Sequence, residues 1–267
     1  HLRVLTSSSA SAEKLKARGV QEILLGDFRN DTDLDRLMDG TTTLVHIPPA
    51  VAEDEHLIGL RAIAAAQKAE LEHFVFVSCF HSLIRELRHH HNKLLVEQAL
   101  ATSGLNYSVL QPAMFMQNLN YIWTKIGQGI FEWPWDPTKK YTMVDTLDLG
   151  EAIARVVTNP RLRGGTYELC SPDTVSVVEM AEILGAAMGK PLLARRQNPE
   201  EWASAMQAGG APTWSVETVM GMCHYHDNYG YDGGNSFALE ALLGRPARSY
   251  KAFAARVAEQ QLDAVPA

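Results

Sequence analysis

The chain has 267 residues, of which 46% are hydrophobic and 21% charged, so it can bury a sizeable core and is not of the intrinsically disordered class. Its 31 acidic and 24 basic residues give a formal net charge of -7 without a basic block, which argues against a direct nucleic-acid partner. No run approaches the roughly 18 apolar residues of a membrane helix, and no signal-peptide pattern opens the sequence, so we expect no membrane association.

The three cysteines, Cys79, Cys170 and Cys223, have no paired spacing. The first two close apolar, strand-like runs, where a buried thiol is usual. An odd count of this kind is typical of reduced thiols, so we expect a cytoplasmic protein without a disulfide framework.

Short apolar runs alternate with helix-period segments through the first half of the chain. In the first helical segment, Ser11 and Glu13 suit a helix start and Gly19 suits its end. This rhythm predicts an α/β fold with a doubly wound parallel sheet. Strands are expected at residues 2–6, 22–27, 41–49, 73–79 and 106–112, and helices at 9–19, 31–40, 54–71, 85–103 and within 116–129.

The rhythm loosens after Gly129, and the C-terminal third reads as a smaller α+β lobe. Within residues 141–160 a strand ends at Asp145, and Asp148 is placed to cap the helix that follows. Residues 164–170 read as another strand, and Ser176 with Glu179 three residues later forms a capping box. The tail from residue 191 is expected to mix short helices with a Gly-, Asn- and Tyr-rich loop at residues 224–235.

The most specific motif runs from Lys93 to Asn118 and reads K-x-x-x-E-x-x-L-x-x-S-G-L-x-Y-S-x-L-x-P-x-x-F-M-x-N. LLGD precedes it, and TMVDTLDLGEAIA, GGTYELCSP and LLGRPARSY follow it. In order and spacing, these segments resemble the NmrA-like family of atypical short-chain dehydrogenases/reductases. The resemblance covers nearly the whole chain.

The resemblance implies a Rossmann-like domain over residues 1–170, which binds a nicotinamide dinucleotide, and a substrate-binding lobe over residues 171–267. Dinucleotides bind at the carboxyl ends of the strands in such sheets. Mapped onto this sequence, the implied cofactor-binding residues are Thr6, Ser7, Asp27, Phe28, Ile47, Pro48, Ser78, Lys93, Pro112 and Phe115.

The family's opening strand and glycine-rich turn, which hold the pyrophosphate, do not appear in this sequence. The run at residues 2–6 matches the family's second strand instead. We expect the sequence to be truncated before this strand, and the alternative is a real loss of the phosphate cradle.

The residues after that strand, Thr6 to Ser9, also depart from the family pattern, which often has an arginine or an acid there. Hydroxyl groups bind a phosphate without the bidentate charge of arginine, so they discriminate weakly between NADP and NAD. Lys14 lies one helical turn further on. By family habit, NADP(H) is favoured over NAD(H).

Related classical reductases use a Tyr-x-x-x-Lys pair on one helix face, and here His89 stands four residues before Lys93. The resemblance implies that Lys93 reaches the nicotinamide ribose. His89 has an ordinary pKa that suits a proton donor, and the alternatives are a solvated lysine and a pocket-lining or surface histidine. Ser78 closes a strand near the implied pocket and is a third catalytic candidate.

Aromatic and amide side chains follow the last strand of the motif. Phe115, Asn118, Tyr121 and Trp123 are candidates for the substrate pocket, with core packing as the alternative for the aromatic ones. Trp133 and Trp135 lie in a segment that the family places over the same pocket.

No metal site is expected. His89, His90 and His91 are successive residues and point about 100° apart on a helix, and His224 and His226 lack supporting ligands.

The sequence thus favours an NAD(P)-dependent oxidoreductase that passes a hydride to a small, flat aromatic or quinone-like acceptor. The alternative is a non-catalytic NAD(P)-sensing regulator of the NmrA type with a protein partner, which the missing tyrosine favours. A minor alternative is a cofactor-free isomerase or cyclase on the same fold. A homodimer is compatible with each of these.

Overall fold

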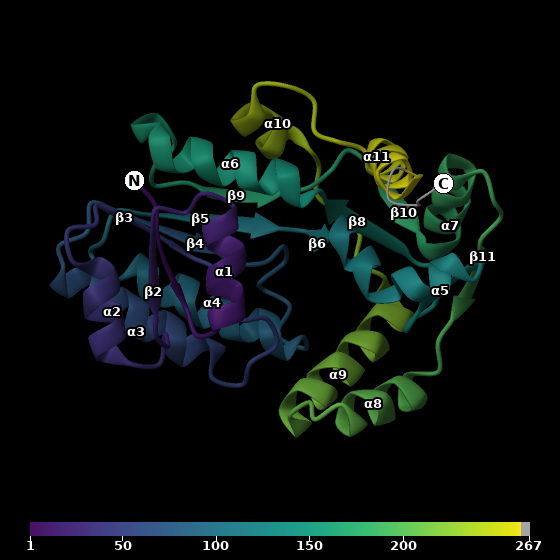
Figure 1. Ribbon diagram of the computed structural model, residues 1–267, viewed down its shortest axis with the longest axis horizontal. Coiled ribbons are helices and arrows are strands. Elements are labelled where there is room, and N and C mark those ends of the chain that lie inside the picture. The colour runs from purple at the N-terminus through teal and green to yellow at the C-terminus, as the bar shows by residue number, and fades with distance from the viewer. Residues whose placement is uncertain (263–267) are drawn as a thin grey trace.

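The first lobe is built on a parallel sheet whose strands, in order across it, are β3 (Thr43–His46), β4 (His73–Val77), β5 (Tyr107–Pro112) and β9 (Thr166–Leu169) (Figure 1). The structure is a computed structural model that describes residues 1–262. Strand β4 is buried along its whole length, and its continuous apolar sequence suits a strand that helices cover on both faces.

Helices lie on both faces of this sheet, which confirms the predicted doubly wound α/β fold. The three helices on one face are α2 (Asp31–Met38), α3 (Glu55–Lys68) and α4 (Arg88–Ala101), and the two on the other are α6 (Thr146–Thr158) and α10 (Phe237–Leu243) (Figure 1).

The first two strands, β1 (Arg3–Thr6) and β2 (Glu22–Leu25), pair in parallel and form a sheet of their own within residues 1–262. Helix α1 (Ser9–Ala17) connects them and ends, as predicted, before Gly19. Its start differs from the prediction, because the Ser8 side chain caps it by accepting a hydrogen bond from the backbone N–H of Ser11. Several serines in a row offered alternative caps, and Ser8 is the one whose side chain accepts from the first turn of the helix.

Helices α3 and α4 pack side by side, and Gly59 permits the close contact. A Cβ atom at Gly59 would lie 2.5 Å from Cγ2 of Val96 on α4. Because no side chain intervenes, Glu55 on the first turn of α3 comes within reach of Lys93 on α4.

The second lobe contains a small mixed sheet and a parallel strand pair. Its capping box at Ser176 and Glu179 is confirmed. The sheet consists of β10 (Thr174–Ser176), β8 (Lys140–Val144) and β6 (Met114–Phe115), and the pair of β7 (Ile130–Trp133) and β11 (Leu193–Arg196). The helices are a 3-10 helix at Met116–Ile122, α5 (Trp123–Gly127), α7 (Val177–Met188), α8 (Pro199–Ala208), α9 (Thr213–Tyr229) and α11 (Tyr250–Leu262).

The larger of two buried hydrophobic clusters runs through both lobes, since Val75 of β4 and Leu110 of β5 belong to the same cluster as Trp133 and Tyr141. Strands β6, β7 and β8 of the second lobe precede residue 170 in the chain. The division of the chain at that residue remains a prediction.

The start of α6 differs from the prediction. Asp145, not Asp148, is the capping residue, and its carboxylate accepts from the backbone N–H of Leu147. Asp148 lies in the first turn, almost fully buried, and pairs with Arg245 and Arg248 of the C-terminal segment. Asp148 therefore binds two arginines that are distant in the chain, and its position in the helix sequence does not reveal these contacts.

The predicted loop at residues 224–235 is wrong in its first half, because α9 continues to Tyr229. Buried Val216, Val219, Cys223 and His226 follow a helical period, and they hold the helix against the core despite its polar composition. The helix ends at Gly230, which has a φ of 71°.

No helix within residues 1–262 is long and apolar enough to cross a membrane. In the same part of the chain, no three His, Cys, Asp or Glu side chains gather in a way that suits a metal ion.

Candidate active site at the carboxyl ends of the parallel strands

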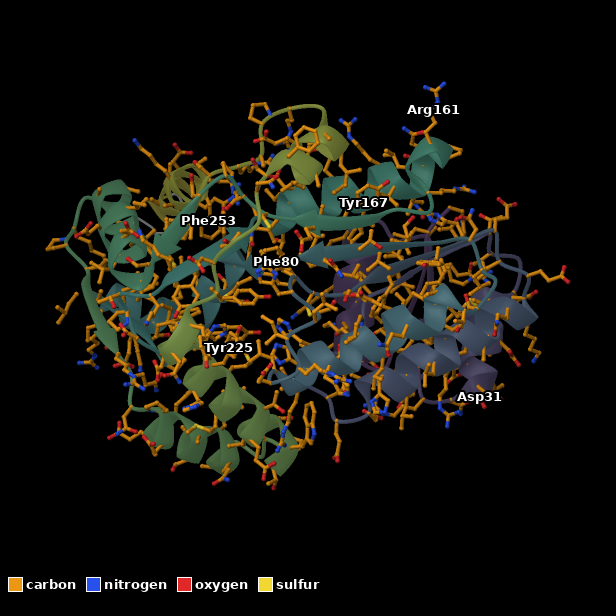
Figure 2. All side chains as sticks on the ribbon, turned by 180° about the vertical axis from the view of Figure 1, so that it is seen from behind. Asp31, Phe80, Arg161, Tyr167, Tyr225 and Phe253 are labelled. Atoms are coloured by element: carbon orange, nitrogen blue, oxygen red, sulfur yellow. The ribbon has the colours of Figure 1, made fainter. Side chains whose placement is uncertain are left out.

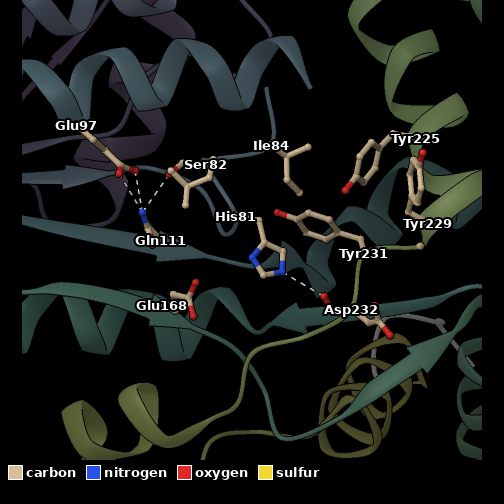
Figure 3. Close-up of a pocket in the computed structure, with 12 residues that line it drawn as sticks. His81, Ser82, Ile84, Glu97, Gln111, Glu168, Tyr225, Tyr229, Tyr231 and Asp232 are labelled. Carbon is tan, nitrogen blue, oxygen red and sulfur yellow. Dashed lines mark hydrogen bonds between the residues drawn. The ribbon is translucent and has the colours of Figure 1, made fainter. Parts of the chain in front are cut away.

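A cavity of about 480 Å³ opens where β4, β5 and β9 end (Figure 3). One side is formed by the loop after β4, residues 81–84, and by single residues of α4, β5 and β9. The other side is formed by the end of α9 and the segment that follows it, up to Asp232. Ligands of doubly wound sheets bind at this edge, so the cavity is the candidate active site.

Glu97 of α4 forms the polar inner wall of the cavity. The Nε2 group of Gln111 donates to both of its carboxylate oxygens, at 2.9 and 3.0 Å, and the hydroxyl of Ser78 donates to one of them. Gln111 Nε2 also lies 3.2 Å from the hydroxyl of Ser82 (Figure 3). A carboxylate can only accept hydrogen bonds, and the donors of Gln111 and Ser78 supply them to Glu97.

His81 lies at the centre of the lining with a strained backbone. Its φ is 56°, in the left-handed region that non-glycine residues seldom adopt, and such strain is common at functional sites. Its Nε2 atom is 3.2 Å from the carbonyl oxygen of Asp232 (Figure 3). Close by, the Tyr231 hydroxyl donates to the carbonyl of Phe80 at 2.5 Å. These contacts tie the loop after β4 to the segment after α9.

Lys93 lies one helical turn before Glu97 and forms an ion pair with Glu55 of α3. The Nζ–Oε1 distance is 2.5 Å, and the two side chains are 12% and 1% exposed. Burial raises the pKa of Glu55, while the Lys93 ammonium opposes that rise. Lys93 also lies 6.0 Å from the centre of the Phe76 ring. The lysine is therefore fixed in place by its surroundings and is not a solvated surface residue.

His46, at the end of β3, lies close to this pair. Its ring is 1% exposed, stacks on Phe76 at 5.9 Å and has no hydrogen-bond partner for either nitrogen among the described residues. Burial, followed by the charge of Lys93, lowers the pKa of His46 to about 3. The imidazole is thus neutral, with two unused polar atoms.

His89 precedes Lys93 by one turn of α4. Burial lowers its pKa well below 6.5, and the neighbouring His90 and Lys93 add to this effect. At neutral pH the ring is uncharged, and a neutral imidazole is a far weaker proton donor than an imidazolium.

The predicted cofactor residues fall into two groups. Ser78 and Lys93 lie around Glu97, and Phe28 approaches this group because its ring is 6.0 Å from that of His46. None of the predicted cofactor residues lines the cavity itself, Ser78 and Lys93 included. Of the others, Thr6 ends β1, Ser7 and Asp27 follow β1 and β2, Ile47 is 60% exposed, Pro48 is buried after β3, and Pro112 is buried at the end of β5.

None of the four predicted substrate residues lines the cavity. Phe115 is in β6 and packs against the core, as does Trp123. Tyr121 is 88% exposed, and Asn118 lies in the 3-10 helix. Trp133 and Trp135 are buried in the core.

Sequence reasoning missed several residues of the site. Glu97 stands in the K-x-x-x-E motif four residues after Lys93, on the same helix face, and that spacing was a usable signal. Nothing in the local sequence indicates Glu55, because its partner is on another helix. Only the fold brings together the other lining residues, which are His81, Gln111, Glu168 and the tyrosines of the cavity.

Three known reductases are similar to the chain in sequence or in structure. NAD(P)H azoreductase of Xenophilus azovorans is 28% identical over 257 residues, which are 94% of this chain and 87% of the azoreductase. The quinone oxidoreductase QOR2 of Escherichia coli, solved with NADPH, has a TM-score of 0.80 at 20% identity and covers 96% of this chain and 89% of its own. Triphenylmethane reductase of Citrobacter sp., solved with NADP(H), has a TM-score of 0.79 at 20% identity, with 96% and 90% covered.

The solved structures support the Rossmann-like fold. The sequence pattern of the NmrA-like family matches residues 1–253, which is nearly the whole chain. The chain belongs to the NmrA-like family.

Proposed function

We propose that this chain is an NAD(P)H-dependent oxidoreductase that transfers a hydride from the nicotinamide to a small aromatic or quinone-like acceptor. The observation that carries the proposal is the cavity at the carboxyl ends of β4, β5 and β9, with Lys93 fixed one helical turn behind its inner wall. An azoreductase and a quinone oxidoreductase among the relatives support the reaction class.

The residues next to the cavity fit the nicotinamide and ribose part of such a cofactor. Lys93 would hold the ribose hydroxyls, and the unpaired nitrogens of buried His46 offer polar contacts close to it. Within residues 1–262, no glycine-rich turn stands before a helix to hold the pyrophosphate. When bound, the cofactor supplies the hydride, and the protein supplies orientation and exclusion of water.

We favour NADP(H) over NAD(H). Thr6 ends β1, and Ser7 and Ser8 follow it at the start of α1, so hydroxyl groups and a helix N-terminus would face the adenosine ribose of a cofactor bound as in the family. No carboxylate stands there to bind the free ribose hydroxyls of NADH. NADPH in the QOR2 complex agrees with this preference.

A matched pair of lysine variants tests the proposal. Lys93→Gln should raise the KM for NADPH by about tenfold or more, because a charged hydrogen bond to the ribose is lost. Lys16→Gln, on the exposed surface of α1, should leave it unchanged. Initial rates with naphthoquinone as acceptor give both values, and equal values for the two variants would contradict the role of Lys93.

The regulator remains the second candidate, because His89 is neutral and the Lys93 ammonium already has a partner in Glu55. Such a protein would bind NADPH without oxidising it in the presence of an acceptor. Multiple turnovers per chain would exclude this function.

A further inference from the structure

His81 is held in one orientation at the centre of the cavity. Its backbone carbonyl accepts from Nδ1 of buried His90 at 2.9 Å and from the backbone N–H of Ile84 at 3.0 Å. Its ring packs on the ring of Phe80, with 3.6 Å between the ring centres. Gly233 leaves room for the imidazole, because a Cβ atom there would lie 3.4 Å from Nε2. The backbone and the ring therefore both have a fixed place in the lining.

The two ring nitrogens of His81 have different surroundings. Nε2 lies 3.2 Å from the carbonyl oxygen of Asp232, which can only accept a hydrogen bond, so Nε2 carries a proton. Nδ1 has no hydrogen-bond partner among the described residues, and Figure 3 shows it on the side of the ring toward Gln111 and Glu168. A molecule in the cavity therefore meets Nδ1, which accepts a hydrogen bond in the neutral ring and donates one in the imidazolium.

Hydroxyl groups also line the cavity, but they are weaker acids. The Tyr231 hydroxyl donates to the carbonyl of Phe80. Tyr225 and Tyr229 present phenols. A phenol has an ordinary pKa of about 10, and burial raises the pKa of Tyr225 above it. An alcohol such as that of Ser82 holds its proton more tightly still. Histidine is the side chain that ordinarily gains and loses a proton between about pH 5 and 8, so it suits proton transfer at neutral pH.

Carboxylates of the lining can balance a positive charge on the His81 ring. Glu97, Glu168 and Asp232 line the cavity, and neither lysine nor arginine is among the lining residues. Glu97 accepts from Gln111 at both oxygens, as an ionised carboxylate does. Glu168 and Asp232 are exposed, so water reaches this side of the cavity. An imidazolium formed here lies among negative charges, and water can return a proton that it has given away.

From these observations we infer that His81 is a catalytic residue, which gives its Nδ1 proton to an oxygen of the acceptor during the reduction. This inference rests on the proposed function. The acceptor gains two electrons and one hydrogen as the hydride from NADPH. The Nδ1–H bond of His81 breaks, and an O–H bond forms on the acceptor, so that a quinone leaves as a neutral hydroquinone. The neutral imidazole then takes up a proton from water.

The pH dependence of the wild-type protein tests this role without any variant. With saturating NADPH, and after subtraction of the rate without protein, kcat/KM for naphthoquinone should fall as the imidazolium is lost between about pH 6 and 8. The neighbouring His89 and His90 do not titrate in this interval, because burial lowers the pKa of each. A phenol as the donor would keep the rate constant up to about pH 9, and that result would overturn the inference.

His81→Asn removes the acid and suits the backbone, because asparagine adopts a positive φ more readily than most residues. At neutral pH it should lower kcat/KM for naphthoquinone by about 100-fold, and the fall with rising pH should disappear. The KM for NADPH should stay unchanged, and imidazole in the buffer should restore part of the rate. The control is His224→Asn on the exposed surface of α9, outside the lining, which should keep both the rate and its pH dependence.

Two results with His81→Asn would contradict the inference and leave the proposed function standing. One is a wild-type rate, and the other is a lowered rate that keeps the wild-type pH dependence, since His81 would then serve the structure only. If the wild-type protein itself does not oxidise NADPH with naphthoquinone, the proposed function fails.

Discussion

At the scale of single residues, the site is organised by charges that the fold removes from water. Glu55 is 1% exposed and is matched by the Lys93 ammonium at 2.5 Å, so each charge depends on the other. Breaking a buried pair by removing one partner costs more than the pair itself contributes, because the remaining charge is left unsatisfied. This dependence makes the pair testable by a stability measurement that does not require activity.

Glu55→Gln should lower the free energy of unfolding by about 3 kcal/mol, the lower end of the cost of leaving one charge of a buried pair uncompensated. Glu53→Gln is the matched control, because Glu53 is exposed two residues earlier in the chain. Urea denaturation of both variants gives the comparison. If both unfold at the wild-type urea concentration, Lys93 does not depend on Glu55.

The exchange of tyrosine for His89 gives a second prediction. His89→Tyr places a phenol four residues before Lys93, on the same face of α4, and so restores the pair that protonates a carbonyl oxygen. A positioned acid contributes typically about 100-fold or more, so reduction of a simple aromatic aldehyde should increase by at least about tenfold.

The control for this variant is His91→Tyr, which lies on another face of the same helix. Aldehyde-dependent oxidation of NADPH is the measurement. If the His89→Tyr and His91→Tyr variants reduce the aldehyde equally, position 89 does not face the reacting group.

At the scale of helices and strands, the contact between α3 and α4 determines where Lys93 and Glu55 meet. Gly59→Ala should lower the free energy of unfolding by about 1–3 kcal/mol, because the new Cβ would overlap Val96 at 2.5 Å. Val96→Ala in the same chain should restore part of this loss, since it removes the methyl groups in the way.

The control is Gly150→Ala in α6, where an added Cβ meets nothing within 4 Å. That change should raise stability by about 0.5–1 kcal/mol through helix propensity alone. Thermal unfolding of the three variants and the wild type measures these changes, and a stabilised Gly59→Ala protein would show that the helices are free to move apart.

The strands were predictable because their signal is local. The run from Phe74 to Val77 is apolar throughout and lies between the polar residues His73 and Ser78, which is typical of a strand covered on both faces. Asp148 was misassigned because its partners, Arg245 and Arg248, lie nearly one hundred residues away in the chain. The first half of the predicted loop at 224–235 is helical because buried Cys223 and His226 outweigh the Gly- and Asn-rich composition.

None of the residues that line the cavity was predicted as a site residue; the predicted residues nearest to it, Ser78 and Lys93, lie next to Glu97. Lys93 and Ser78 were identified from their position relative to a strand end and a helix face. The tyrosines of the cavity come from α9 and the segment after it, and their approach to β4 depends on tertiary contacts such as that of Tyr231 with Phe80. A single sequence does not reveal contacts of this range.

At the scale of the whole molecule, buried neutral histidines link stability to pH. Burial lowers the pKa of His46 to about 3 and that of His73, His90 and His226 to about 4. In the unfolded chain these groups take up protons near pH 6.5, so below that pH the unfolded state binds more protons than the native one.

The free energy of unfolding should therefore be at its full value above pH 6.5 and should fall as the pH drops from 6.5 towards 4. Each histidine contributes up to about 1.4 kcal/mol for every unit by which the fold lowers its pKa. The contributions of the four histidines together are a large part of the free energy of unfolding. Urea denaturation at a series of pH values measures the slope. Stability that stays constant over this interval would show that these histidines are accessible to protons in the native state.

Hydride transfer by this protein is tested best by a single-turnover experiment with protein in excess over NADPH and naphthoquinone as the acceptor. Oxidation of NADPH should be faster than in the protein-free mixture, and it should slow when the transferred hydrogen at C4 is deuterium, because the C4–H bond breaks in the measured step. Binding of NADPH without any acceleration of its oxidation would contradict the oxidoreductase and leave the cofactor-sensing regulator as the function of this fold.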